Sequence, residues 1–243
     1  NGGWTTLDVK DGPKSDTYKC QCPWLYAGDL CEFGPRRASK YNGNNTSQYG
    51  KYINSSTQFN AFSISVWITI YDDVYYETRH PAVVSHAFQG KEKVHANAPV
   101  ILFIKKNISI YFFDSFRSGH IGDIFDGKQY HIMITWQKVD GQMIVYKDGE
   151  QKYSTIVAEN RTLLAGGVWV IGQDQDSLDG GFQNRNSFKG TIDAVYIWDK
   201  VLSIDDIKQL AKSCNAYLSG YIIGYHDFKF TNTTNLIEPT CYT

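Results

Sequence analysis

The regular alternation of side chains between positions 62 and 70 constrains the fold more than any other feature of the sequence. Apolar residues occupy every second position from Phe62 to Ile70, and Ser, Trp and Thr stand between them. Successive side chains of a β-strand point to opposite faces, so this run predicts a half-buried strand. Further short runs predicted to be strands lie at 100–104, 108–113, 130–136, 143–147, 153–157, 168–171 and 192–198.

Two local signals indicate how these strands are connected. Asp148-Gly149 stands between two of them and predicts a tight hairpin, because Gly accepts the positive φ that this turn requires. Ser203 followed by Asp206 resembles a capping box, and apolar residues at helical spacing follow it. With 15% aromatic residues, this pattern predicts an all-β protein of two antiparallel sheets with one short helix across a sheet.

Length and charge limit the possible functions. The chain has 243 residues, enough for one large β domain and a small appendage. Its formal net charge is -1 with 20% charged residues, so we expect no basic field for nucleic acid. The chain contains no apolar run long enough for a membrane span. It starts at Asn1 without an initiator Met or a signal-peptide pattern, so we expect a processed or incomplete product.

Cysteines and glycosylation sequons both favour secretion. The chain has five cysteines, of which Cys214 and Cys241 stand near its end and are expected to bond to each other. The sequons are Asn44, Asn45, Asn54, Asn107, Asn160 and Asn232, which is a dense set for this length. We therefore expect an extracellular glycoprotein.

The first part of the chain resembles the C-terminal half of an EGF-like module. Cys20, Cys22 and Cys31 have the spacing C-x-C-x8-C, and Gly28 stands three residues before the last cysteine. The resemblance implies an EGF-like segment over 1–34 with a bond from Cys22 to Cys31. It also implies that the partner of Cys20 lies before Asn1 or in another chain. A zinc site is the weaker alternative, because no His or second Cys pair accompanies the motif.

A cluster of oxygen donors lies on a glycine-containing loop after residue 171. Its acidic members are Asp174, Asp176 and Asp179, and its amides are Gln175, Gln183 and Asn186. Calcium takes six to eight oxygen ligands, so this donor set suits Ca²⁺. The alternative is a solvated polar loop whose glycines only make a turn.

The same region resembles the calcium loop of pentraxins. The resemblance lies in Ile171–Gly190 and in the Ile192–Asp199 segment after it, and Val201-Leu202-Ser203 matches the V-L-S that opens the family's helix. A second match is His131-Ile-Met-Ile-Thr135-Trp136, similar to the signature H-x-C-x-[ST]-W. The resemblance covers roughly 38–230 and implies a pentraxin-like jelly roll, also similar to laminin-G sandwiches, over 35–243 with calcium on one face. Met133 replaces the signature cysteine, and Ser65 replaces its usual partner.

The resemblance also implies roles for individual residues. Asp174 and Asp176 would bridge two calcium ions, Gln175 would offer its main-chain carbonyl, and Gln183 and Asn186 would serve the outer ion. Gln183 is neutral where the family more often has an acid, so the second ion should bind more weakly. Asn97 would contribute from the other side of the site. Phe103 is either the aromatic that packs against a ligand beside the calcium or a core aromatic.

Enzyme interpretations find less support. The Asp174 to Asp179 spacing superficially resembles a glycosidase motif, but these residues are Asp on a loop rather than Glu on a strand. No nucleophile elbow G-x-S-x-G is present, and His131 is interpreted as a buried hydrogen-bonding residue rather than a base.

We therefore expect a secreted, oligomeric, calcium-dependent binding module rather than an enzyme. It would be lectin-like or serve pattern recognition, with a glycan or a phosphorylated headgroup as ligand. The alternative is a structural subunit of an extracellular ring or filament, in which calcium only orders a loop.

Overall fold

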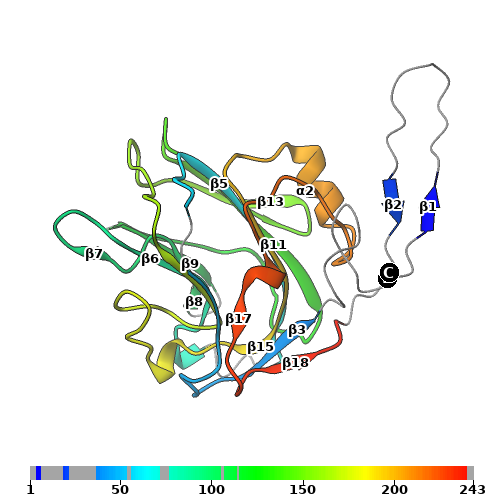
Figure 1. The fold of residues 1–243 in the computed structure, drawn as a ribbon, viewed down its shortest axis with the longest axis horizontal. Coiled ribbons are helices and arrows are strands. Elements are labelled where there is room, and N and C mark those ends of the chain that lie inside the picture. The colour runs from blue at the N-terminus through cyan, green and yellow to red at the C-terminus, as the bar shows by residue number, and fades with distance from the viewer. Residues whose placement is uncertain are drawn as a thin grey trace.

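The computed structural model describes residues 4–6, 19–21, 37–53, 56–71, 77–104, 107–113 and 115–239. Its main body is a sandwich of two antiparallel sheets, as predicted (Figure 1). The first, called the β14 sheet, has the order β10 (Ser115–Gly119), β9 (Asn107–Phe112), β8 (Val100–Ile104), β6 (Ala82–Gln89), β14 (Val168–Ile171), β4 (Gly50–Ile53) and β17 (Lys229–Phe230). A short strand, β7 (Val94–His95), pairs with β6.

The second sheet, called the β5 sheet, packs against the first. Its order is β13 (Glu150–Ile156), β12 (Gln142–Lys147), β11 (Gln129–Gln137), β5 (Ala61–Thr69), β15 (Lys189–Trp198), β3 (Ala38–Asn42) and β18 (Asn235–Ile237). The strand β16 (Ile223–Gly224) pairs with β15. Two 3₁₀ helices, η1 (Asn184–Asn186) and η2 (Tyr225–Asp227), lie in the connections.

The inner faces of the two sheets form one core. Phe62 on β5, Trp136 on β11 and Phe112 on β9 are fully buried, with ring centroids 4.8 to 5.7 Å apart. Such aromatic contacts add to the free energy gained by burying the rings. The indole Nε1 of Trp136 donates to the Val157 carbonyl at 3.0 Å, so the largest side chain of this cluster leaves no polar atom unpaired.

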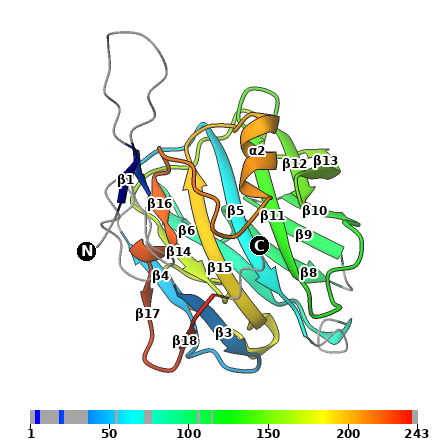
Figure 2. The ribbon, with the colours of Figure 1, turned by 90° about the vertical axis from the view of Figure 1, so that its right-hand side faces the viewer.

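The helix predicted after Ser203 is α2 (Ile204–Leu210), and it covers the outer face of the β5 sheet (Figure 2). The Ser203 hydroxyl accepts a hydrogen bond from the Asp206 main chain at 3.2 Å, as expected for a cap. Ile207 and Leu210 pack on Met133 and Trp198 of the sheet. The helix therefore completes a second, smaller core outside the sandwich.

The expectation of a half-buried β5 was wrong, because both faces of this strand are buried. Ser63 and Ser65, on the face predicted to be polar and exposed, are 0% and 2% exposed. Their hydroxyls have partners: Ser63 donates to the Lys200 carbonyl at 2.8 Å, and Ser65 lies 2.8 Å from Nε2 of His131. The alternation remains because small hydroxyl side chains can be buried when the segment around α2 supplies hydrogen bonds.

Three finer sequence expectations agree with the structure. Met133 and Ser65 are directly paired across β11 and β5, as the resemblance implied for the positions of a missing disulfide. Asp148 and Gly149 both have positive φ, at 51° and 79°, and join β12 to β13 in a tight hairpin. His131 is fully buried, and burial lowers its pKa to about 3, which fits a structural residue rather than a base.

The cysteine expectations are tested only in part. The short strands β1 (Trp4–Thr6) and β2 (Lys19–Gln21) pair antiparallel, with Thr5 opposite Cys20, but this pairing does not establish an EGF-like module. Cys214 is buried and disulfide-bonded. Its expected partner, Cys241, lies outside the described residues, as do Cys22, Cys31 and the proposed boundary at residue 34.

Candidate functional site: an acidic loop after β14

The predicted calcium loop connects the two sheets, running from the end of β14 to the start of β15 along one edge of the sandwich (yellow in Figure 1). It leaves β14 through Gly172, whose φ of +87° is a conformation that side chains with a Cβ rarely adopt. The η1 helix occupies its second half. The loop is thus fixed at both ends by buried strands.

Contacts with the β3–β4 segment hold the loop in place. The Gln173 amide donates to the carbonyls of Asn45 at 2.8 Å and Gln48 at 3.1 Å. Lys51 on β4 forms an ion pair with Asp179 at 2.9 Å. In addition, the ring of Phe182 lies 4.8 Å from that of Tyr49. These contacts join residues that are more than 120 positions apart in the sequence, so the loop conformation depends on the tertiary fold.

Four of the predicted ligands lie together as two hydrogen-bonded pairs. Oδ2 of Asp174 accepts from the amide of Asn186 at 3.0 Å. Oδ2 of Asp176 accepts from the amide of Gln183 at 2.5 Å. Each pair joins a carboxylate on the first half of the loop to an amide near η1. The structure therefore brings together the carboxylates and the amides that the sequence singled out.

The carboxyl group of Asp174 is in an environment that disfavours its ionised form. It is 7% exposed, and its Oδ1 atom is buried without a hydrogen-bond partner among the described residues. Burial, with a smaller contribution from the negative charge of Asp176, raises its pKa to about 7; Arg185 and the Gln175 main chain oppose this rise. A divalent cation would give this oxygen a partner and offset the repulsion, so these residues fit a calcium ion.

The side chain of Gln175 helps to hold the loop together. Its side chain is fully buried and engaged, since Nε2 donates to the Val168 carbonyl at 3.0 Å and Oε1 accepts from the Asp179 main chain at 3.2 Å. Both polar atoms of the side chain therefore already have hydrogen-bond partners. Its main-chain carbonyl is the group that it could offer a cation.

Three other candidates stand apart from the two pairs. The Asp179 carboxylate is bound to Lys51. Asn97 precedes β8, and its main-chain carbonyl accepts from the Phe113 main chain at 2.6 Å. Asn97 takes no part in the hydrogen bonds described for the two acid–amide pairs. Phe103 is fully buried and packs edge-on against Phe125 at 5.9 Å, which favours the core interpretation over contact with a ligand.

The donor set is mostly neutral. Within the described ranges, no three His, Cys, Asp or Glu side chains gather closely enough to hold a metal by themselves. A cation here would depend on Asp174 and Asp176 with amide and main-chain oxygens, which is compatible with Ca²⁺ and poorly suited to zinc.

The sequence analysis missed two charged residues around the loop, Lys51 on β4 and Arg185 within the loop itself. Arg185 is exposed on η1, and its Nε donates to Oδ1 of Asn186 at 3.3 Å. A signal was present, because Arg185 is the one cation between Ile171 and Phe188. Its relation to Asp174 depends on the fold of the loop and could not be read from spacing.

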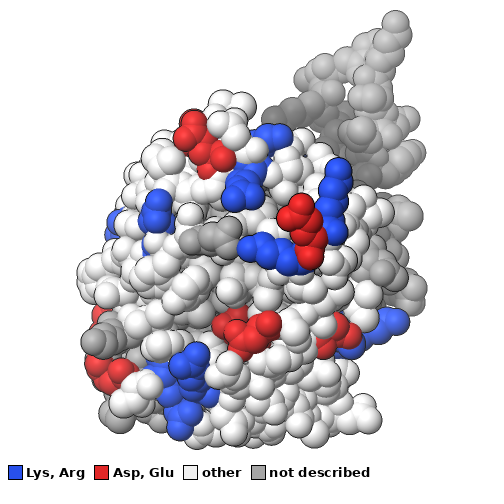
Figure 3. Space-filling view, turned by 90° about the vertical axis from the view of Figure 1, so that its left-hand side faces the viewer, with Lys and Arg blue, Asp and Glu red and all other residues white. Residues whose placement is uncertain are grey.

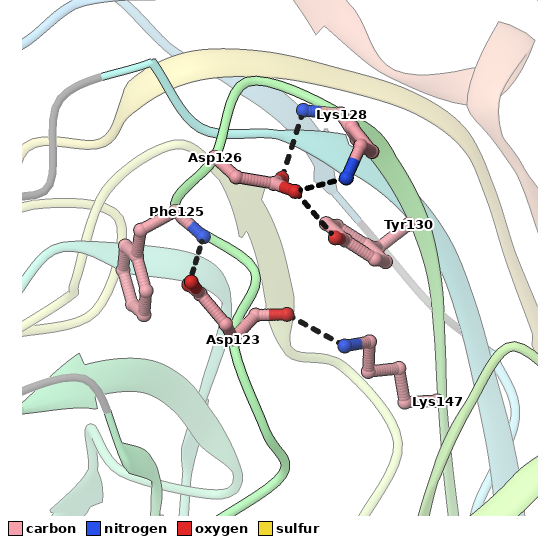
Figure 4. A network of polar contacts seen from close by, with 6 residues as sticks. All are labelled: Asp123, Phe125, Asp126, Lys128, Tyr130 and Lys147. Carbon is pink, nitrogen blue, oxygen red and sulfur yellow. Dashed lines mark hydrogen bonds and ion pairs between the residues drawn. The ribbon is translucent and has the colours of Figure 1, made fainter.

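A second polar network lies on the segment before β11 and serves a structural purpose (Figure 4). Oδ2 of Asp126 accepts from Lys128 Nζ at 2.7 Å and from the Tyr130 hydroxyl at 3.0 Å. Lys147 Nζ donates to the Asp123 carbonyl at 2.6 Å and lies 4.2 Å from the centre of the Tyr130 ring. These groups satisfy one another, so the network braces the segment against β11 and β12.

Surface features agree with the composition. On the face shown in Figure 3, basic and acidic side chains are scattered among uncharged ones and form no continuous basic field.

The predicted glycosylation sequons differ in exposure. Asn44, Asn160 and Asn232 are exposed, Asn45 and Asn107 are half-buried, and Asn54 lies outside the described residues. No helix in the described part of the chain is long and apolar enough to cross a membrane.

Comparisons with known proteins identify the family. The model of the Pentaxin family matches residues 48–239. Neuronal pentraxin-2 of Mus musculus is 30% identical over 190 residues, which is 74% of this chain and 40% of that protein. Sushi, von Willebrand factor type A, EGF and pentraxin domain-containing protein 1 of Rattus norvegicus is 41% identical over 105 residues, 42% of this chain. The chain covers 3% of this much longer relative.

A solved structure supports the same fold. The heptameric SAP-like pentraxin from Limulus polyphemus superimposes with a TM-score of 0.71 at 20% sequence identity. The superposition covers 84% of this chain and 96% of the Limulus chain. Together with the family match over most of the sequence, this shows that the chain belongs to the Pentaxin family.

Proposed function

We propose that this chain is an extracellular module that binds a ligand through calcium held by the loop after β14. The observation that carries the proposal is the buried Asp174 carboxyl, with one oxygen lacking a partner and the Asp176 charge beside it. Asp176 and the Gln175 carbonyl would complete the ion's protein ligands, with Asn186 and Gln183 on the outer side. A bound ion offers open positions to hydroxyl, carboxylate or phosphate oxygens of a ligand.

Several observations support an extracellular location. Cys214 is disulfide-bonded, which is typical of proteins in oxidising compartments. Three sequons stand on exposed residues, where a glycan meets no steric obstacle. The name of the Rattus norvegicus relative mentions both EGF and pentraxin domains, the two kinds of module that the sequence predicts here.

We also propose that the module self-associates. The Limulus pentraxin is heptameric, and a fold shared over 84% of this chain can place equivalent surfaces in contact. Light scattering should give a mass that is a multiple of the chain mass. A monomer at micromolar concentration, with and without calcium, would contradict self-association while leaving ligand binding intact.

We assign the loop no catalytic role. Its two central carboxylates are short Asp side chains held by amide groups, and one of them is buried. This arrangement suits a fixed cation better than an acid and a nucleophile on opposite sides of a substrate bond.

Retention on immobilised glycans separates ligand binding from a purely structural role. The wild-type chain should be retained in calcium and released by a chelator, and Asp176→Ala should abolish retention. Asp199→Ala, which removes an exposed carboxylate after β15, serves as the matched control and should bind like the wild type. Calcium binding without chelator-sensitive retention on any glycan or phosphorylated matrix would favour the alternative of a structural subunit.

A further inference from the structure

The turn that follows β3 begins with an Asn-Gly step, Asn42-Gly43. The sequence has one other such step, Asn1-Gly2, which lies outside the described residues. Gly43 and Asn44 have φ of 71° and 49°, so the chain leaves β3 in a left-handed conformation. Among the asparagines that the structure describes, Asn42 alone precedes a residue without a Cβ, which leaves its carboxamide open to the next main-chain nitrogen.

The side chain of Asn42 is available for reaction. Asn42 is exposed, and its carboxamide makes no hydrogen bond within the described part of the chain. Its main-chain N–H is bound instead, because it donates to Oε1 of Gln48 at 2.9 Å. No side-chain hydrogen bond therefore has to break before the carboxamide can react.

The reaction open to Asn42-Gly43 is loss of ammonia through a cyclic imide. The Gly43 nitrogen gives up its proton to base and attacks Cγ of Asn42, and the side-chain nitrogen takes up a proton and leaves as ammonia. Water then opens the ring. Cleavage at Cγ gives aspartate, and cleavage at the main-chain carbonyl gives isoaspartate, whose main chain runs through Cγ and is longer by one carbon. The step consumes one water, releases one ammonia and needs no oxidant or reductant.

Gln48 connects this turn to the loop after β14. Gln48 is buried; its Oε1 accepts from the Asn42 main chain, and its Nε2 donates to the Thr233 carbonyl at 3.0 Å. The main-chain carbonyl of Gln48 accepts from the Gln173 amide at 3.1 Å, and Oε1 of Gln173 accepts from the Ser187 hydroxyl at 3.2 Å. A path of hydrogen bonds thus runs from the end of β3 to both halves of the loop.

An isoaspartate at position 42 would disturb this path at its start. It adds one bond, about 1.5 Å, to a turn whose length sets the distance between the Asn42 main chain and Gln48. The turn has little room to absorb the change, because Gly43 and Gln48 are both buried. The carbonyls that hold Gln173 would therefore shift away from it.

We infer that Asn42-Gly43 is a site of spontaneous deamidation in the folded chain, and that the isoaspartate formed there loosens the loop after β14. The modification and the loosening follow from the turn and its hydrogen bonds alone. An effect on calcium binding rests in addition on the proposed function, because it requires an ion at that loop.

Peptide mapping of the aged, folded chain tests the modification. After weeks at neutral pH, the peptide that contains Asn42 should carry the mass increase of an amide converted to an acid, and fragmentation should identify isoaspartate. Asn235, exposed on the neighbouring β18 and followed by Leu236, is the internal control and should remain intact. Conversion should be faster in alkaline than in acidic buffer, because the deprotonated Gly43 nitrogen is the nucleophile. An intact Asn42, or equal conversion at Asn42 and Asn235, would overturn the inference.

Amide hydrogen exchange tests the loosening without reference to calcium. In the isoaspartate form, segment 173–188 should exchange severalfold faster than in the fresh chain, because the loop opens more often. Exchange unchanged in the isoaspartate form would overturn this half of the inference. In calorimetry, the same form should bind calcium severalfold more weakly than the fresh chain.

Two variants separate the charge from the longer main chain. Asn42→Asp, measured fresh, has the charge of the products with a normal backbone, and its loop should exchange like that of the fresh wild type. Asn42→Gln keeps a carboxamide but would need a larger ring, so it should neither deamidate nor change on ageing. Ageing that loosens the loop equally in Asn42→Gln would overturn the assignment to this site. Absence of calcium binding by the fresh wild type would contradict the proposed function and leave the results from mass and exchange standing.

Discussion

Single residues of the loop differ in how far the sequence could predict them. The identity and spacing of Asp174 and Asp176 predicted a cation site, and the structure joins them by hydrogen bonds to two amides of the same predicted cluster. The burial of Asp174 and of Phe103 was not predictable, because it depends on strands distant in the sequence. Lys51 was missed for the same reason, since it reaches Asp179 from β4.

The raised pKa of Asp174 predicts that calcium binding weakens in acid. Burial and the charge of Asp176 raise this pKa to about 7, so below that value the ion must displace a proton. Affinity should fall by up to about tenfold for each pH unit below 7, and each ion bound near pH 6 should release a proton. Calorimetry in buffers of different ionisation enthalpy measures both. Equal affinity at about pH 6 and about pH 8, without proton release, would contradict this account.

His131 predicts a loss of stability in acid. Burial lowers its pKa from 6.5 to about 3 in the folded chain. Between these values the unfolded chain binds a proton that the folded chain does not, so the free energy of unfolding falls as the pH drops below 6.5. The loss from this residue is about 2 kcal/mol at about pH 5. Burial also lowers the pKa of His86, to about 4, so His86 contributes a loss of the same sign.

The variant His131→Asn isolates the first contribution. It keeps a polar partner for Ser65 and does not titrate, while His86 is present in both proteins. Urea unfolding at about pH 7 and about pH 5 should show that the wild type loses more stability than the variant by about 2 kcal/mol. The same loss in both proteins would show that His131 is not the responsible group.

At the scale of elements, strands with a clear pattern were predicted and strands without one were missed. The predicted ranges for β8 and β14 match the structure, and that for β5 is displaced by one residue at each end. β6 was missed because it is buried on both faces along most of its length, so its sequence does not alternate. The very short strands at the end of the chain pair only through tertiary contacts and carry no periodicity.

The capping of α2 predicts a measurable contribution from Ser203. The hydroxyl of Ser203 accepts from the Asp206 main chain and donates to its carboxylate at 2.7 Å. Ser203→Ala should lower the free energy of unfolding by about 1 kcal/mol, and Ser203→Asp should retain most of it. Ser154→Ala, at an exposed position on β13, is the matched control. A cost in Ser203→Ala no larger than in the control would mean that the cap does not stabilise the folded chain.

At the scale of the whole molecule, the sandwich positions the loop and a disulfide stabilises the region after α2. Cys214 is bonded, and we expect its partner to be Cys241. In the chain-entropy model, closing this loop stabilises the folded state by roughly 3–4 kcal/mol. Peptide mapping without reduction should recover the linked pair. Recovery of Cys214 joined to Cys20 instead would require the EGF-like assignment to be rebuilt.

At the scale of the whole molecule, the fold could be predicted from the sequence more completely than the ligand. Alternation, turns and the helix cap were sufficient to predict the sandwich, and the family match over 48–239 agrees with it. The ligand depends on a few residues around one loop, which the general fold does not specify. Arg185, a positively charged residue on this loop, is one of these residues.

Calorimetric titration of the chelator-treated chain with calcium tests the central claim most directly. The account predicts saturable binding of calcium that Asp174→Ala and Asp176→Ala each abolish, whereas Asp199→Ala binds like the wild type. All variants should first be shown to remain folded by circular dichroism. Absence of calcium binding by the folded wild type, or binding that survives loss of both Asp174 and Asp176, would contradict the account.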